Sequence, residues 1–82
     1  MVETRIATRH RVNKPAIVEY GGLKQPCILR DISSTGAALE FPDLARTMRL
    51  PERFNLIVPE DKLRLACRTV WHREYRMGVT FE

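Results

Sequence analysis

The stretch FNLIVPEDKLRLACR, residues 54–68, decides the fold of this chain. Its apolar side chains occupy every second position on both sides of a central break, first Phe54, Leu56 and Val58, then Leu63, Leu65 and Cys67. Successive side chains of a β-strand point to opposite faces, so each set lines one face of a sheet. The break, Pro59-Glu60-Asp61, has turn chemistry. We therefore predict two antiparallel strands joined by a tight turn.

Four further segments have β character and are separated by residues that favour turns. Gly21-Gly22 stands at hairpin distance between the first two, and Ser33 to Gly36 separates the second from the third. Six short strands predict an all-β fold, a small antiparallel β-barrel whose closure leaves no open sheet edge. Only residues 43–50 are compatible with a short helix, with Asp43 as its N-cap. The four segments are residues 15–20, 26–32, 37–41 and 76–81.

The length and composition indicate one small globular domain. Eighty-two residues leave no room for a second core, and 44% hydrophobic with 29% charged residues argues against disorder. No apolar run approaches the ~18–20 residues of a membrane-spanning helix. The N-terminus also lacks the apolar segment of a secretory signal. We expect a cytoplasmic protein with no membrane insertion.

The net charge of +4 is concentrated at the N-terminus. The first fourteen residues carry one acidic side chain, Glu3, and four basic ones, Arg5, Arg9, Arg11 and Lys14. With few apolar anchors, residues 1–14 are predicted to form a flexible arm, and residues 15–82 the barrel. Arginine suits bidentate contact with phosphate and stacking on flat rings. The arm therefore indicates either a phosphate-bearing partner or a solvated tail.

Catalysis and metal binding find no support in the sequence. Cys27 and Cys67 lack the CxxC spacing, lie in strand-like runs and are expected to be reduced core residues. His10 and His72 have no cysteine or histidine at ligand spacing, so no metal site is predicted. No GxSxG nucleophile turn is present. We predict a protein that is not an enzyme and has no cofactor.

Two short motifs stand apart from what a barrel needs. In the first, Arg5 and Arg9 are four residues apart, which places both guanidinium groups on one side of a helix or a strand. In the second, Asp31-Ile32-Ser33-Ser34-Thr35-Gly36, the Asp and Ser side chains can accept backbone hydrogen bonds and Gly36 can supply a positive φ. Taken singly, the arginine pair can be a coincidence of composition, and the second motif can be no more than a well-capped turn. Together they suit a guanine nucleotide, because guanine offers O6 and N7 to an arginine fork and N–H groups to a carboxylate.

The two motifs together resemble the signature of PilZ domains, which is R-x-x-x-R on an N-terminal arm followed by D/N-x-S-x-x-G after a β-strand. Residues 11–16 and 54–59, and the tail from Val70-Trp71 to Met77-Gly78-Val79-Thr80-Phe81, are also similar to short single-domain members common in alphaproteobacteria. The resemblance implies a six-stranded barrel that acts as a bacterial receptor for the second messenger cyclic di-GMP. The matching motif residues are Arg5, Arg9, Asp31, Ser33 and Gly36.

The resemblance assigns a role to each motif residue. Arg5 and Arg9 would grip guanine and phosphate, and Asp31 would hydrogen-bond the guanine edge. Ser33 would contact a phosphate or a guanine, and Gly36 would allow close approach of the backbone.

Three residues outside the motifs are candidates for additional ligand contacts. Arg11 and Arg30 are near the motifs in sequence, and Trp71 could stack on a base, although burial in the core is its expected fate. Thr4 stands where many relatives have Arg or Leu, a position associated with the number of ligand molecules bound. One or two cyclic di-GMP per site therefore remain open alternatives.

The leading hypothesis is a non-catalytic cyclic di-GMP receptor whose arm becomes ordered on the ligand and creates a surface for an unidentified downstream protein. One alternative is a small barrel that binds single-stranded nucleic acid. Aromatic residues interleaved with the basic face are typical of such domains, whereas Phe41, Phe54 and Phe81 fall on predicted core positions. A second alternative is a protein adaptor that binds no nucleotide, which the pair of motifs disfavours.

Overall fold

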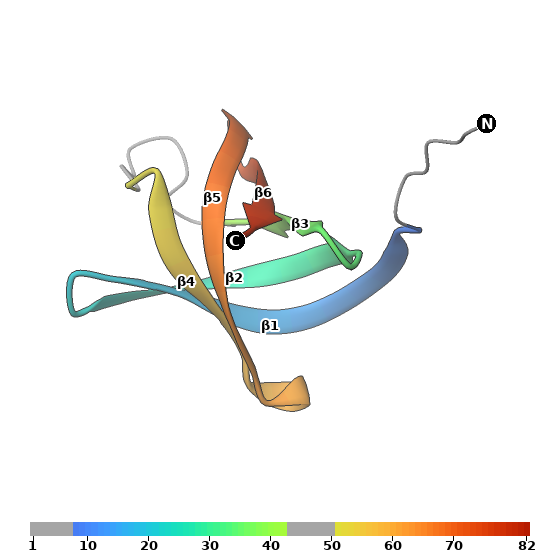
Figure 1. Ribbon diagram of the computed structural model, residues 1–82, viewed down its shortest axis with the longest axis horizontal. Helices are drawn as coiled ribbons and strands as arrows, with labels where there is room; N and C mark the ends of the chain where they lie inside the picture. The colour runs from blue at the N-terminus through green and yellow to red at the C-terminus, as the bar shows by residue number, and fades with distance from the viewer. Residues whose placement is uncertain (1–7, 43–50) are drawn as a thin grey trace.

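A computed structural model describes residues 8–42 and 51–82 of the chain (Figure 1). Every pair of neighbouring strands is antiparallel, and the order β1-β2-β3-β6-β5-β4 closes into a barrel. The predicted all-β, six-stranded antiparallel barrel is therefore confirmed. The strands are β1 (His10–Tyr20), β2 (Leu23–Ile32), β3 (Gly36–Glu40), β4 (Arg53–Val58), β5 (Leu63–Arg73) and β6 (Arg76–Phe81), with one 3-10 helix, η1 (Pro59–Asp61).

The turns follow the predicted chemistry. Gly21 and Gly22 form the two-residue loop between β1 and β2 with φ of 53° and 81°, the positive values that a tight hairpin of this length requires. The segment Pro59–Asp61 between β4 and β5 is the 3-10 turn. The helix predicted over residues 43–50 lies outside the described residues. No helix in the described ranges is long and apolar enough to cross a membrane.

The core is built from the alternating positions that the sequence indicated. Phe54, Leu56 and Val58 of β4 are buried and face Leu39 and Phe41 from the other side of the barrel. Alternate burial along β4 repeats the alternation of its sequence. A barrel this small has space for one layer of such side chains.

Both cysteines are buried and carry free thiols, as predicted. Burial raises the pKa of the Cys27 thiol to about 12. Burial also raises the pKa of Cys67, to about 11. Since the thiolate is the reactive form, neither cysteine is poised for nucleophilic chemistry.

Strand β1 begins earlier than the sequence predicted. His10 pairs with Ile32 and Arg11 with Asp31, so residues 10–14 belong to the β1–β2 ladder rather than to an arm preceding residue 15. This extension was not predicted because four of the five side chains at positions 10–14 are polar, which leaves Val12 alone and no apolar alternation to follow. Backbone hydrogen bonds to β2, which any residue except proline can donate and accept, hold it in the sheet.

Three strands contain an irregularity in register. The shifts fall between Arg11 and Lys14 in β1, between Leu29 and Asp31 in β2, and between Thr69 and Trp71 in β5. An extra residue in one strand of a pair reverses which face the following side chains occupy.

The irregularity in β5 overturns the prediction that Trp71 is a core residue. Thr69 faces inward, with its hydroxyl 3.8 Å from Sδ of the buried Met77. Strict alternation would also turn Trp71 inward, but the extra residue Val70 reverses the phase, and Trp71 is 43% exposed. Its indole lies over Gly78 on the outer face, where a Cβ would collide with the ring.

Candidate ligand-binding site

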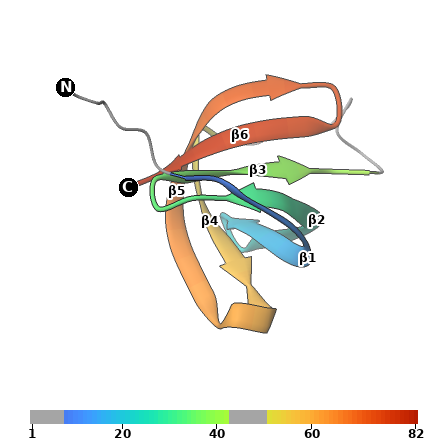
Figure 2. The same cartoon turned by 90° about the vertical axis from the view of Figure 1, so that its right-hand side faces the viewer.

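The β2–β3 turn lies beside the start of β1, as the two views show (Figures 1 and 2). The hydroxyl of Ser33 organises this turn, because its Oγ accepts hydrogen bonds from the amides of Thr35 and Gly36, each at 3.2 Å. The Ser33 amide donates to the Gly36 carbonyl at 2.9 Å. Ser33 therefore caps the turn, the structural role that Asp31 and Ser33 were expected to share.

The carboxylate of Asp31 has a different environment. Its Oδ1 atom is buried and has no hydrogen-bond partner in the described part of the chain. The guanidinium of Arg9 forms an ion pair with this carboxylate, with Nε 3.8 Å away, beyond hydrogen-bond distance. Buried carboxylate oxygens are normally hydrogen-bonded, so an oxygen without a donor at a rim is a position where a ligand N–H can bind.

Gly36 is required for close packing and not for a positive φ. The positive φ values among the described residues occur at Gly21, Gly22, Lys62 and Glu74, so the expectation of a left-handed Gly36 is wrong. A Cβ at position 36 would instead collide with the backbone carbonyl of Val79 on β6. The glycine lets β3 and β6 approach at the end of the sheet where the turn begins.

One row of residues crosses the outer face of the sheet from Asp31 to Trp71. Cross-strand partners place their side chains on the same face. The successive partners across five strands are Arg11, Asp31, Ala38, Gly78 and Trp71. The row places the acceptor at one side and an exposed aromatic ring at the other, with two small residues between them. Both small residues are buried, Gly78 beneath the indole of Trp71.

A polar pocket of about 180 Å³ opens at the Asp31 end of this row. Arg76 on β6 also lines this pocket, and it was not among the site residues predicted from the sequence. Its only sequence signal was its place in an alternating strand, since the pairing of β3 with β6 decides what it approaches. The pocket is lined by Arg11, Val12, Arg30, Asp31 and Arg76.

A second pocket, of about 320 Å³, lies at the β5–β6 hairpin. It contains two exposed aromatic residues, Trp71 and Tyr75, together with Arg73 and Arg76. Arg76 lines both pockets, so they are neighbours on the outer face.

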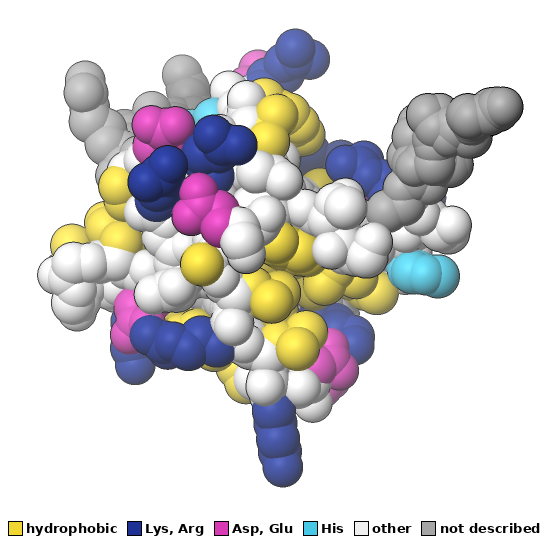
Figure 3. Space-filling view, in the orientation of Figure 1, with side chains coloured by type: hydrophobic (Ala, Val, Ile, Leu, Met, Phe, Trp, Pro, Cys, Tyr) yellow, Lys and Arg dark blue, Asp and Glu magenta, His cyan; other side chains and the backbone are white. Residues whose placement is uncertain are grey.

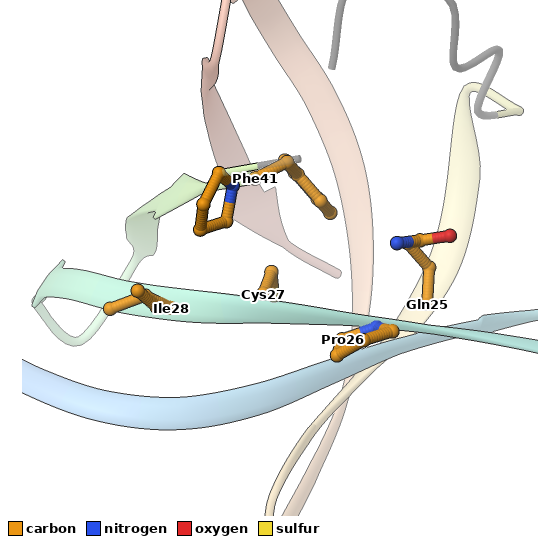
Figure 4. Close-up of a pocket in the computed structure, with 6 residues that line it drawn as sticks. Gln25, Pro26, Cys27, Ile28 and Phe41 are labelled. Atoms are coloured by element: carbon orange, nitrogen blue, oxygen red, sulfur yellow. The ribbon is translucent and has the colours of Figure 1, made fainter. Parts of the chain in front are cut away.

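The other features of the surface are weaker candidates. An apolar pocket of about 140 Å³ lies between β2 and the end of β3, and Phe41, Pro42 and residues 25–28 line it (Figure 4). It holds none of the predicted site residues. Within the described ranges, no group of three His, Cys, Asp or Glu side chains could hold a metal ion.

Charge on the visible face is mixed. Lys and Arg side chains stand beside Asp and Glu, without one continuous basic patch on that side (Figure 3). Ion pairs account for some of the acidic side chains of the described residues, since Glu82 lies 3.2 Å from Arg53 and 4.0 Å from Arg68.

The structure brings together most of the predicted site residues. Arg9, Arg11, Arg30 and Asp31 meet at one end of the outer face, and the turn of Ser33 and Gly36 adjoins them. Trp71 lies at the far side of the row. Arg5 lies outside the described residues.

The fold and the site together define a small β-barrel with arginine and carboxylate side chains gathered at one end of its outer surface. A comparison with family models matches residues 3–82 to the PilZ domain. The chain belongs to the PilZ domain family, whose members are in general receptor domains that bind cyclic di-GMP rather than enzymes. The comparison with curated proteins finds no match.

Proposed function

We propose that this chain is a receptor for cyclic di-GMP that uses the RxxxR arm, Arg5 and Arg9, and the DxSxxG turn, Asp31 to Gly36. The observation that carries the proposal is the environment of Asp31. Within residues 8–42 and 51–82, its buried Oδ1 has no hydrogen-bond donor, and the Arg9 guanidinium lies 3.8 Å away. A guanine base supplies N1–H and N2–H donors for a carboxylate and O6 and N7 acceptors for an arginine.

The remaining contacts follow from the arrangement around Asp31. Arg11 and Arg30 line the adjoining pocket, where their guanidinium groups could donate hydrogen bonds to a phosphate of the ligand. Trp71 exposes one side of its indole for a base to stack on, which contributes about 1–3 kcal/mol per base in single-strand-binding proteins. Ser33 and Gly36 hold the turn against β6, and Ser33 is also the motif candidate for a phosphate or guanine contact.

The signal would be the ordering of the arm. We expect residues 3–9 to be mobile without ligand, because Arg5, Arg9 and Arg11 repel one another and few apolar side chains offset the ordering entropy. The two phosphates of the ligand remove that repulsion, and the docked arm presents a new surface to a downstream protein. Backbone amide order parameters with and without ligand test this, and His10 to Val12 of β1 provide the reference. Rigid values for residues 3–9 in the free protein would contradict the mechanism.

A titration calorimetry experiment separates this function from its alternatives. The protein is titrated with cyclic di-GMP, with GTP and with a short single-stranded oligonucleotide. We expect binding to cyclic di-GMP alone, weakening as salt is raised because charges are screened. Preference for the oligonucleotide would favour the nucleic-acid barrel, although Phe41 and Phe54 are buried and unavailable for stacking. Binding to none of the three would favour a ligand-independent adaptor. A cytoplasmic location remains a prediction.

A further inference from the structure

Glu40 on β3 places its carboxylate between two arginines that line the Asp31 pocket. Its Oε1 lies 3.3 Å from Nε of Arg30 and 3.9 Å from Nη2 of Arg76. Arg30 also donates a hydrogen bond of 3.4 Å to Oδ1 of Asn13. We call these three charged side chains the Glu40 triad: Arg30, Glu40 and Arg76.

The topology of the sheet explains how the Glu40 triad assembles. Glu40 is the cross-strand partner of Arg76, so both side chains lie on the outer face, two residues along from Ala38 and Gly78. Arg30 is the residue skipped between the pairs Leu29–Leu39 and Asp31–Ala38. The irregularity in β2 therefore brings an arginine to the same face as Asp31, its sequence neighbour, where alternation would have separated them.

Charge in this region is only partly balanced. Three guanidinium groups, those of Arg11, Arg30 and Arg76, line the pocket with one carboxylate, Asp31. Glu40 supplies a second carboxylate at its edge and pairs with two of the three arginines. Without Glu40, Arg30 and Arg76 would form a pair of adjacent cations facing the pocket.

The Glu40 triad is accessible enough to exchange partners. The exposed fractions of the side chains are 39% for Arg30, 29% for Glu40 and 58% for Arg76. Ion pairs in contact with solvent are weak, since water competes for both charges. A phosphate can accept paired hydrogen bonds from guanidinium groups and carries a charge comparable to that of a carboxylate.

We propose that Arg30 and Arg76 form a phosphate-binding subsite, and that in the ligand-free protein Glu40 occupies it as an internal competitor. Binding exchanges the carboxylate of Glu40 for a phosphate of the ligand, and Glu40 turns to water. The ligand identity rests on the proposed function, whereas the exchange at Arg30 and Arg76 rests on the Glu40 triad alone. Glu40 thereby sets the affinity of the site.

The test compares Glu40→Gln with Glu19→Gln. Both substitutions remove one negative charge, but Glu19 pairs with Arg64 near the other end of β1. In cyclic di-GMP titrations at low salt we expect Glu40→Gln to bind about three- to tenfold more tightly than wild type, the size of effect expected for the loss of one competing charge that water screens. Glu19→Gln should match wild type. Adding Arg76→Ala and Arg30→Ala to Glu40→Gln should abolish its gain.

A second measurement, on the wild-type protein, tests the phosphate-binding subsite without the nucleotide. Inorganic pyrophosphate is titrated while the Nε–H resonances of Arg30, Arg76 and Arg64 are followed by NMR. Shifts at Arg30 and Arg76 without a shift at Arg64 support the exchange, and equal or absent shifts overturn it. Unchanged or weaker cyclic di-GMP binding by Glu40→Gln, with wild type binding normally, also overturns the proposal. If wild type ignores cyclic di-GMP, the proposed function fails and the pyrophosphate result alone decides the subsite.

Discussion

The guanidinium of Arg9 lies 3.8 Å from the carboxylate of Asp31, although the two residues belong to different sequence motifs. The contact arises because Arg9 directly precedes β1 and Asp31 lies near the end of β2, its antiparallel partner, where Arg11 pairs with Asp31. A hairpin with a two-residue loop brings the outer ends of its strands together. The β1–β2 ladder is thus what places the end of the RxxxR motif over the DxSxxG motif.

Arg9→Ala should weaken cyclic di-GMP binding by about ten- to a hundredfold, the loss of charge-assisted hydrogen bonds of about 1.5–3 kcal/mol. The thermal midpoint should change little, since the Arg9 side chain is 62% exposed. Arg64→Ala, which removes the partner of Glu19 elsewhere on the barrel, is the control and should bind normally. Arg5→Ala is expected to behave as Arg9→Ala does. Unaltered titration isotherms for both arm variants would contradict the assignment of the arm.

Asp31→Ala should abolish most of the binding with little loss of stability, because the amides of the turn bond to Ser33 and not to Asp31. Asp31→Asn should retain much of the affinity, since its amide oxygen is still an acceptor for guanine N–H groups. Calorimetric titration and thermal unfolding of the two variants measure this. Equal loss of binding in both would mean that the site needs the negative charge and not merely an acceptor.

Ser33→Ala should destabilise the barrel by about 1 kcal/mol, because two turn amides lose their acceptor. For a domain of this size that lowers the thermal midpoint by about 4–8 °C. Ser34→Ala is the matched control, since Ser34 is exposed and makes no described hydrogen bond through its side chain. Similar melting curves for the two variants would show that the hydroxyl of Ser33 does not cap the turn.

Gly36→Ala should be far more damaging than Gly78→Ala. The new methyl group at position 36 meets the Val79 carbonyl of the β3–β6 ladder, and backbone cannot move aside without breaking that ladder. At position 78 it meets the indole of Trp71, which can swing outward. We expect Gly36→Ala to lower the free energy of unfolding by about 1–3 kcal/mol or more. For Gly78→Ala we expect a red shift in the emission of Trp71, the single tryptophan. An unchanged emission spectrum would contradict the stacking of Trp71 on Gly78.

The buried thiols should make the barrel sensitive to alkali. The pKa of Cys27 is raised to about 12 from an ordinary value of 9.0, so the folded state holds its proton more tightly than the unfolded state. The contribution of this thiol to the stability of the folded state is therefore complete below pH 9. It declines by about 1.4 kcal/mol per pH unit between pH 9 and the folded pKa. Urea unfolding of wild type at a series of pH values above 8.5 should show the decline. Cys27→Ala should show a shallower slope, and parallel slopes would exclude Cys27 as the cause.

The sequence by itself determined the class of fold and most of the motif residues. Alternating apolar positions such as those of residues 54–58 need only local geometry to specify a strand, since the period of two is a property of the extended backbone. Gly21-Gly22 likewise specified its hairpin through the positive φ that glycine permits. The two motifs could be recognised from the sequence because each is contiguous along the chain, and because the pair is more specific than either motif alone.

Only the tertiary structure decided which face each site residue occupies. Continued alternation would have turned Asp31 and Trp71 inward after Leu29 and Thr69, but the irregularities at Arg30 and Val70 reverse the phase of both strands. The Glu40 triad was equally hidden, because Arg30, Glu40 and Arg76 come from three strands. A shift in register depends on hydrogen bonds to a partner strand distant in the sequence, and closure of the barrel selects those partners. The alternation of apolar and polar residues within a single strand therefore cannot predict where such a shift occurs.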